Sequence, residues 1–309
     1  MKIAITGATG FIGRYLVRYL SQQGHGGNLW YRPSSDRDGV CPSPDNFQWV
    51  PGDLDDPISM RRLVDRCDAV VHAALFHPGG GFRGGEGDPI EFLQRNVIGT
   101  ARLIETARQA NVARFVFIST CAVHERILDD RPLDETHPLW PTSLYGAHKA
   151  AIEKLVHAYG YGQGVAICAV RPTGVYGIAT PPHDSKWFDL VRSIVRGDDV
   201  LCQRGGKEVH AGDLARAVGV LLTANAICGE AYNCYDQYIS EFEVASIARD
   251  ICGSRSSIEG QTPQPKHQIV TTKLRALGVE FGGETRLRET VRGLVDYARE
   301  LADQESQQE

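Results

Sequence analysis

Residues Met1 to Gly13 read MKIAITGATGFIG. A short apolar run, Ile3 to Ile5, ends at Thr6, glycines follow at a regular spacing, and an amphipathic segment begins at Phe11. A short apolar run is typical of a buried strand, and closely spaced glycines are typical of a tight turn. Apolar residues spaced along one side are typical of a helix. The stretch therefore predicts a strand, a turn and a helix start, in that order.

The glycines of this turn indicate a dinucleotide site. A helix N-terminus has unpaired backbone N–H groups and a partial positive charge, so a pyrophosphate fits there. Gly7 supplies the turn angles, Gly10 lets the chain approach the phosphates, and Gly13 lets the helix pack on the strand. An ordinary glycine-rich turn is the alternative. The expected cofactor contacts are Gly7, Thr9, Gly10, Phe11, Ile12 and Gly13.

Length and composition narrow the class of protein. The chain has 309 residues, a net charge of −5 and a pI near 6.1, which allows one large or two unequal domains and argues against nucleic acid as the main partner. No apolar run approaches the ~18 residues that span a bilayer, and no signal peptide is recognised, so we expect a cytoplasmic protein without a membrane partner.

The eight cysteines form no CxxC pair, which indicates reduced thiols and no metal site. Cys121 is either a packed small side chain or a reactive thiol.

The end of the expected second strand bears on the choice of cofactor. An acidic residue there would bind a free ribose 2′-hydroxyl, whereas an arginine favours a 2′-phosphate. Arg32 and Ser35 stand at this place and no acid does. The cofactor is therefore NAD or NADP, with NADP favoured by Arg32. Alternatively, Arg32 lies flat on the adenine or faces solvent.

Two further strand ends carry candidate cofactor contacts. Asp53 and Leu54 follow the third strand, where they would meet the adenine. The apolar run 69–74 is typical of a strand in a parallel sheet covered on both faces, and its small Ala73 and Ala74 leave room for the middle of the cofactor. His72 is interpreted as a strand residue. The glycine-rich stretch 76–88 that follows is either a substrate-gating loop or a flexible surface loop.

Thr120, Tyr145 and Lys149 are the candidate catalytic residues. Thr120 follows an expected strand, and Tyr145 and Lys149 stand four apart at a helix start, so their side chains point the same way. A solvated helix face is the alternative. A phenol has a pKa near ~10, and a nearby ammonium and a positive nicotinamide favour its ionised form. Tyr145 would then remove a proton from a substrate hydroxyl and return it, with Thr120 bound to the same oxygen and Lys149 also holding the nicotinamide ribose.

Taken in order, these motifs resemble the extended short-chain dehydrogenase/reductases of the NAD-dependent epimerase/dehydratase family. The resemblance rests on the glycine turn, Asp53-Leu54, HAA at 72–74, NVIGT at 96–100, ST at 119–120, YGAHK at 145–149 and RPTGVYG at 171–177. It selects Thr120 over Ser119 as the catalytic hydroxyl. It also implies that Asn96 lies near the catalytic lysine, where a structural role is equally open, and that Pro172 and Val175 contact the nicotinamide end.

The resemblance implies an α/β fold with a Rossmann-type doubly wound parallel sheet and a smaller, mostly helical substrate domain. Residues 1–177 would form the dinucleotide-binding domain, with 230–236 returning as a further strand, and 178–309 the substrate domain. Relatives grip a nucleoside diphosphate with this second domain, and the side chains available for that are Lys186, Trp187, Arg192 and Arg204. His124-Glu125 and Val209-His210 depart from the family pattern, which leaves the sugar unidentified.

Three functions are compatible with the pattern. The first is an NAD(P)-dependent nucleotide-sugar epimerase, an isomerase that oxidises a ring hydroxyl transiently. The second is an oxidoreductase, either an NADP-dependent carbonyl reductase or an alcohol dehydrogenase, and the third is a non-catalytic dinucleotide sensor. A dehydratase is disfavoured because Cys121-Ala122 replaces the Asp-Glu usual in that branch. The resemblance also implies a homodimer formed through the helices at 89–111 and 145–159.

Overall fold

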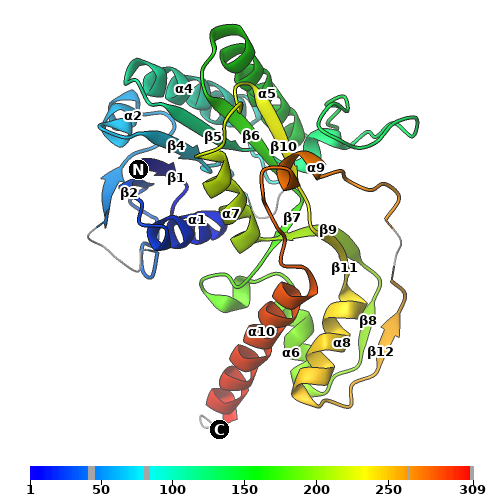
Figure 1. Cartoon of the computed structure of the whole chain (residues 1–309). Helices are drawn as coiled ribbons and strands as arrows, with labels where there is room; N and C mark the ends of the chain where they lie inside the picture. The colour runs from blue at the N-terminus through cyan, green and yellow to red at the C-terminus, as the bar shows by residue number, and fades with distance from the viewer. Residues whose placement is uncertain (41–45, 80–83, 263–264, 307–309) are drawn as a thin grey trace. The chain divides into compact units, whose positions relative to one another are not determined.

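A seven-stranded parallel sheet is the frame of the larger of two compact units in the computed structural model, which describes residues 1–40, 46–79, 84–262 and 265–306 (Figure 1). The strand order is β3-β2-β1-β4-β5-β6-β10, and each neighbouring pair is parallel. The chain therefore winds outward from β1 in both directions, which is the doubly wound Rossmann arrangement. The strands are β1 (Lys2–Thr6), β2 (Gly26–Tyr31), β3 (Phe47–Pro51), β4 (Ala69–His72), β5 (Arg114–Ile118), β6 (Ile167–Pro172) and β10 (Glu230–Cys234).

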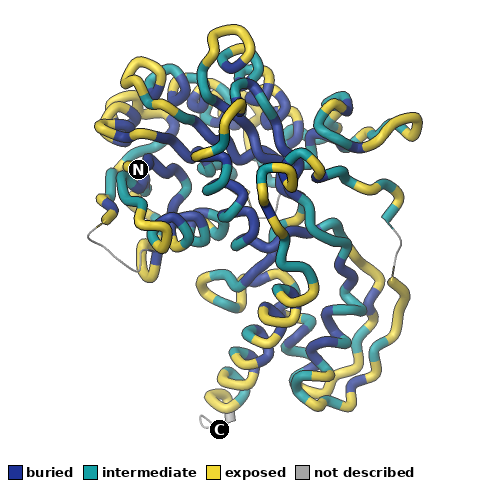
Figure 2. Tube along the Cα trace, in the orientation of Figure 1, coloured by how far each residue is buried: buried dark blue, intermediate teal, exposed yellow. Residues whose placement is uncertain are grey.

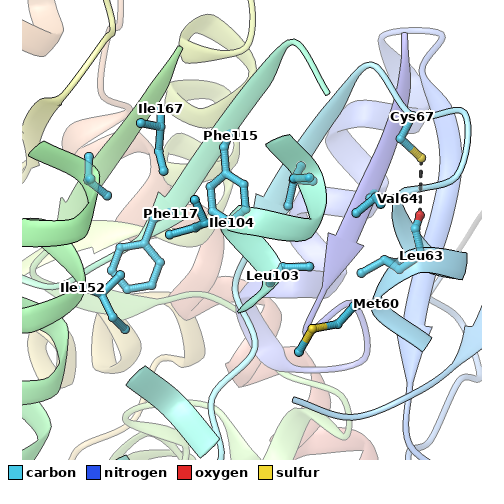
Figure 3. Close-up of a cluster of buried hydrophobic side chains, with 14 of the residues drawn as sticks. Met60, Leu63, Val64, Cys67, Leu103, Ile104, Phe115, Phe117, Ile152 and Ile167 are labelled. Atoms are coloured by element: carbon cyan, nitrogen blue, oxygen red, sulfur yellow. Dashed lines mark hydrogen bonds between the residues drawn. The ribbon is translucent and has the colours of Figure 1, made fainter. Parts of the chain in front are cut away.

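Helices cover both faces of this sheet. On one face lie α2 (Pro57–Val64), α4 (Gly99–Gln109) and α5 (Leu144–Gln163), and on the other α1 (Phe11–Gln22) and α7 (Ala211–Leu221) (Figure 1). Apolar side chains of α2, α4 and α5 meet those of the strands in one core cluster, in which Phe115 and Phe117 of β5 lie between the helices (Figure 3). The inner strands β1, β4, β5 and β6 are buried, whereas edge strand β3, the loops and the outer helix faces are more exposed (Figure 2). This burial on both faces explains why β4 reads as an apolar run.

The expected long helix at 89–111 is interrupted. It consists of α3 (Pro89–Leu93), a π-helical turn at Gln94–Ile98 and α4. Asp88 begins it, because its carboxylate accepts a hydrogen bond from the Glu91 backbone at 2.8 Å. π-Turns of this kind are rare and are frequently found at functional sites.

The second unit comprises Gly174–Asp213, Tyr235–Gln268 and Glu280–Glu309. Helices α6 (Phe188–Arg196), α8 (Glu241–Cys252) and α10 (Gly283–Ser306) share one apolar core. Two small sheets that were not predicted, β11-β9-β7 and β12-β8, accompany these helices. Their strands are β7 (Gly174–Tyr176), β8 (Val200–Cys202), β9 (Gly205–His210), β11 (Gln237–Ser240) and β12 (Ile258–Gly260).

The two units divide the chain close to the predicted boundary at residue 177, and the larger unit takes back more of the chain than the predicted strand at 230–236. The larger unit contains Met1–Thr173, and the chain re-enters it at Leu214–Cys234 and Ile269–Val279. The second of these re-entries includes the short helix α9 (Thr272–Arg275). Part of the glycine-rich stretch (80–83) and Cys41 lie outside the described residues. No helix in the described part of the chain is long and apolar enough to cross a membrane.

Candidate dinucleotide pocket and active site

The turn after β1 needs its glycines for steric reasons. Gly7 has φ +72°, and a Cβ on it would lie 2.7 Å from the backbone of Ala73. A Cβ on Gly13 would lie 1.9 Å from the Gly7 carbonyl oxygen, so helix α1 approaches the turn only because that side chain is absent. Within the described chain no side chain caps the start of α1, whose N-cap is Gly10. The uncapped N-terminus beside a close-packed turn fits a pyrophosphate.

A pocket of about 240 Å³ opens beside this turn, at the carboxyl ends of β1, β2, β3 and β4. That is the switch point of the sheet, where doubly wound folds bind ligands. Nine residues expected to contact the cofactor line it: Gly7, Thr9, Gly10, Arg32, Ser35, Asp53, Leu54, Ala73 and Ala74. Five lining residues were missed by sequence reasoning, namely Trp30, Tyr31, Gly52, Leu75 and Phe76. Their nearness to predicted strand ends was the available signal.

The loop after β2 is fixed by its own hydrogen bonds. The Ser35 N–H donates to the Arg32 carbonyl at 2.8 Å, and the Arg32 N–H donates to Ser35 Oγ at 3.2 Å. The Arg37 guanidinium lies 4.5 Å from the centre of the Tyr31 ring. Two arginines thus stand in the loop after β2, and one of them, Arg32, lines the pocket. This is a suitable environment for an additional phosphate.

Asp53 and Asn96 are engaged with neighbouring groups. Asp53 Oδ1 accepts from the Leu54 N–H at 2.6 Å. Asn96 is buried, with 2% of its surface exposed. Its Oδ1 accepts a hydrogen bond from the Phe76 N–H at 2.8 Å, and its Nδ2 donates to the Phe76 carbonyl at 2.9 Å. Asn96 Nδ2 also donates to the Phe92 carbonyl at 3.0 Å. Asn96 therefore holds a pocket-lining residue in place in this structure.

Thr120 and Tyr145 are brought together by the ends of β5 and α5. Ser143 caps α5 by accepting from the Gly146 N–H at 3.0 Å, which places Tyr145 in the first turn of that helix. The Tyr145 hydroxyl hydrogen-bonds to Thr120. Burial raises the pKa of Tyr145, and the Thr120 bond offsets this only in part. This direction is opposite to the lowering expected from a nearby ammonium.

Lys149 is buried one turn further along α5. Its Nζ donates to the Ile118 carbonyl at 2.7 Å and lies 4.6 Å from the centre of the Phe117 ring. Burial lowers the pKa of Lys149 to about 7, and the negative charge of Glu153 opposes that shift. The amine is therefore poised between its charged and neutral forms near neutral pH.

Glu153 and Arg171 form a buried ion pair behind these residues. Arg171 Nη2 lies 2.6 Å from Glu153 Oε2, and Arg171 Nε lies 3.0 Å from each carboxylate oxygen. The Ser119 hydroxyl donates to Glu153, which leaves Thr120 as the hydroxyl beside Tyr145. Arg171 Nη1 donates to His124 Nε2 at 3.2 Å. Sequence reasoning missed this pair, although an arginine inside the apolar run at 167–172 was a signal for one.

The family of this chain is established by comparison with known proteins. The NAD dependent epimerase/dehydratase family matches residues 3–234, well over half of the chain. The chain belongs to this family. The predicted resemblance is confirmed, and because this is a family of NAD-dependent epimerases and dehydratases, the chain is an enzyme.

Named relatives of this epimerase/dehydratase family member differ in activity. A trifunctional UDP-glucose 4,6-dehydratase/UDP-4-keto-6-deoxy-D-glucose 3,5-epimerase/UDP-4-keto-L-rhamnose-reductase of Arabidopsis thaliana is 30% identical over 88% of this chain, which spans 41% of that relative's length. A 3 beta-hydroxysteroid dehydrogenase/Delta 5-->4-isomerase of Mycobacterium tuberculosis is 28% identical over 82% of this chain and 70% of its own. The crystal structure of UDP-glucose 4-epimerase from Thermotoga maritima with UDP-glucose has the same fold, with a TM-score of 0.79 and 22% sequence identity. The match covers 98% of this chain and 100% of the epimerase chain.

The remaining expected cofactor contacts of this family member do not line the pocket. Among the described residues, Phe11, Ile12, Gly13, Asn96, Tyr145, Lys149 and Pro172 lie in the larger unit outside the pocket lining, and Val175 lies in β7 of the second unit. In that unit, Lys186 pairs with the buried Glu208, and Arg192 pairs with Glu305 at 2.5 Å. The buried His210 accepts from the Gly212 N–H at 3.0 Å.

Proposed function

We propose that this enzyme is an NAD(P)-dependent epimerase of a nucleotide-linked sugar, which oxidises a ring hydroxyl and reduces it again from the other face. The observation that carries the proposal is the hydrogen-bonded pair Thr120 and Tyr145 with the buried Lys149 one turn away. These residues belong to the same compact unit as the pocket, whose glycine turn fits a pyrophosphate. When bound there, the nicotinamide dinucleotide would supply the reversible two-electron chemistry.

The chain's own residues would hold the substrate oxygen and move its proton. Thr120 binds that oxygen, and Tyr145 removes the proton and later returns it. Because burial raises the pKa of Tyr145, its deprotonation requires positive charge at the site, which the ammonium form of Lys149 supplies. Gly7, Gly10 and the start of α1 would hold the pyrophosphate. Arg32 and Ser35 would favour the 2′-phosphate of NADP.

The second candidate is a dehydrogenase or carbonyl reductase of the same family, which releases its reduced or oxidised cofactor at each turnover. The two arginines at the end of β2 favour it, because NADP use is commoner among reductases. The relative described as a steroid dehydrogenase supports it as well. A 4,6-dehydration is disfavoured, because eliminating water needs an acid and a base and neither Cys121 nor Ala122 is a carboxylic acid. A homodimer through α3–α4 and α5 completes the proposal.

Tyr145→Phe tests the assignment of the acid/base. We expect turnover to fall by about 1000-fold or more, because phenylalanine has no hydroxyl with which to exchange the proton of the substrate. The dissociation constants for NAD and NADP should change by less than about threefold. The matched control is Tyr159→Phe on the same helix, whose hydroxyl donates to Glu105 at 3.4 Å and which should keep full activity. An active Tyr145→Phe enzyme would show that another residue is the base.

A further inference from the structure

One wall of the dinucleotide pocket is fixed at both ends by hydrogen bonds from buried side chains to its backbone. The wall is the run of pocket-lining residues 73–76. At its start, Thr6 Oγ1 accepts hydrogen bonds from the N–H groups of Ala73 and Ala74, both at 3.1 Å. At its end, the Asn96 amide bonds both the N–H and the carbonyl of Phe76. The wall thus has two anchors, on β1 and on the π-helical turn.

His72 connects these two anchors. Its Nδ1 lies 2.7 Å from Thr6 Oγ1, and its Nε2 lies 2.8 Å from Thr100 Oγ1. Thr100 Oγ1 in turn donates to the Asn96 carbonyl at 2.5 Å. Thr6, His72, Thr100 and Asn96 are each at most 2% exposed, so water does not compete for these bonds.

The donors and acceptors around the His72 ring are compatible with one neutral tautomer. Thr100 uses its only proton on the Asn96 carbonyl, so its oxygen must accept from His72 Nε2–H. The unprotonated Nδ1 then accepts the Thr6 hydroxyl proton, while the Thr6 oxygen accepts from the two wall N–H groups. Burial lowers the pKa of His72 to about 3, with a smaller contribution from the charge of Lys149, so this neutral form persists at physiological pH.

We propose that His72 is a positioning residue for the cofactor, a single-tautomer bridge that fixes pocket wall 73–76 through Thr6 and Thr100. The role rests on the proposed use of a nicotinamide dinucleotide. If the bridge breaks, Thr6 and Asn96 lose their common support, and the wall against which the cofactor packs is no longer preorganised. The side chain of His72 does not line the pocket, so its effect reaches the ligand through the backbone of the wall.

The decisive variants are Thr100→Val and Thr6→Val, studied in the 309-residue chain by calorimetric titration with NAD and with NADP. Each removes one end of the bridge with little change of volume, and each should weaken both dinucleotides by about tenfold, since a buried donor or acceptor is left unpaired. Thr6→Ser keeps the hydroxyl and should restore binding to within about threefold. Thr106→Val is the matched control, because Thr106 makes the same bond to the carbonyl four residues back on α4, whereas Thr106 is only half-buried.

Two further measurements separate positioning from general stability. Val156→Ala trims a core side chain outside the pocket lining, so it should lower the free energy of unfolding and leave dinucleotide binding unchanged. Nitrogen NMR of the His72 ring should show the Nε2–H tautomer alone in the parent and a mixture in Thr100→Val.

Parent-like affinity in a folded Thr100→Val or Thr6→Val protein would overturn the positioning role alone, as would two tautomers in the parent. Failure of the unchanged protein to bind either dinucleotide would overturn the proposed cofactor and the positioning role together.

Discussion

Glu153→Gln should destabilise the sheet unit strongly, because it leaves the Arg171 guanidinium buried without its counter-charge. Glu153 is 0% and Arg171 1% exposed, and the carboxylate accepts three of the bonds within 3.0 Å that the guanidinium donates. A glutamine has nearly the same volume, yet its NH₂ group cannot accept from Arg171. The Ser119 hydroxyl also donates a hydrogen bond to this carboxylate, so the substitution perturbs that bond too.

The expected size follows from the burial of the pair. Breaking a buried ion pair by removing one partner costs about 3–5 kcal/mol in unfolding free energy. For a unit of this size, about 2–4 °C of melting temperature is lost per kcal/mol, so the midpoint should fall by about 6–20 °C. Replacing both partners together, as in Glu153→Leu with Arg171→Met, should cost less than either single change, because no buried charge remains.

Urea unfolding followed by circular dichroism measures this difference. The matched control is Glu105→Gln, which breaks the exposed pair with Arg108 in the same unit and should cost at most about 1 kcal/mol. Equal losses in Glu153→Gln and Glu105→Gln would refute the reasoning that the buried pair stabilises this unit through its charges.

Three further outcomes are expected. Arg32→Asp should shift the ratio of NAD to NADP affinity towards NAD by about tenfold or more, measured by titration with each dinucleotide, and an unchanged ratio would remove the argument from the end of β2. The free energy of unfolding should rise between about pH 7 and pH 10, because unfolded Lys149 keeps its proton up to a pKa of about 10.4 while the buried amine has lost it above about 7. Lys149→Met should remove that part of the rise, and an identical pH profile in parent and variant would contradict the buried amine's lowered pKa. Ser240→Ala should cost the second unit about 1 kcal/mol in urea unfolding, because the Ser240 hydroxyl accepts from the Glu243 N–H at 3.1 Å at the start of α8, and no loss would show that this cap is not stabilising.

Much of the sheet unit is predictable from local sequence signals. The glycine turn, the apolar run of β4 and the strand at 230–234 each carry a pattern set by neighbours in the chain. The capping motif of α8 is predictable for the same reason, and both its hydrogen bonds form: Ser240 accepts from the Glu243 N–H, and the Glu243 carboxylate accepts from the Ser240 N–H. Of the nine predicted pocket-lining residues, Gly7, Thr9 and Gly10 follow from the glycine turn, and the other six follow from the rule that ligands bind at the carboxyl ends of parallel strands.

The remaining features depend on contacts between distant segments. The partner of Glu153 lies 18 residues away on a strand, and the partners of His72 lie 66 and 28 residues away, so no local spacing reveals them. The π-helical turn at Gln94–Ile98 has no sequence signal of its own within an otherwise helical pattern. The small sheets of the second unit escaped prediction because β9 contains polar residues and two glycines, and β8 and β12 have three residues each.

The most direct test of the proposed reaction follows absorbance at the reduced-nicotinamide band and product mass together, while the enzyme meets a panel of nucleotide sugars with NAD or NADP. A product isomer of unchanged mass without net accumulation of reduced cofactor is the result expected of an epimerase. Stoichiometric accumulation of reduced cofactor, with a product two hydrogens lighter, would contradict epimerisation and show a dehydrogenase. No conversion across the panel would contradict the nucleotide-sugar assignment and direct the search to small carbonyl substrates.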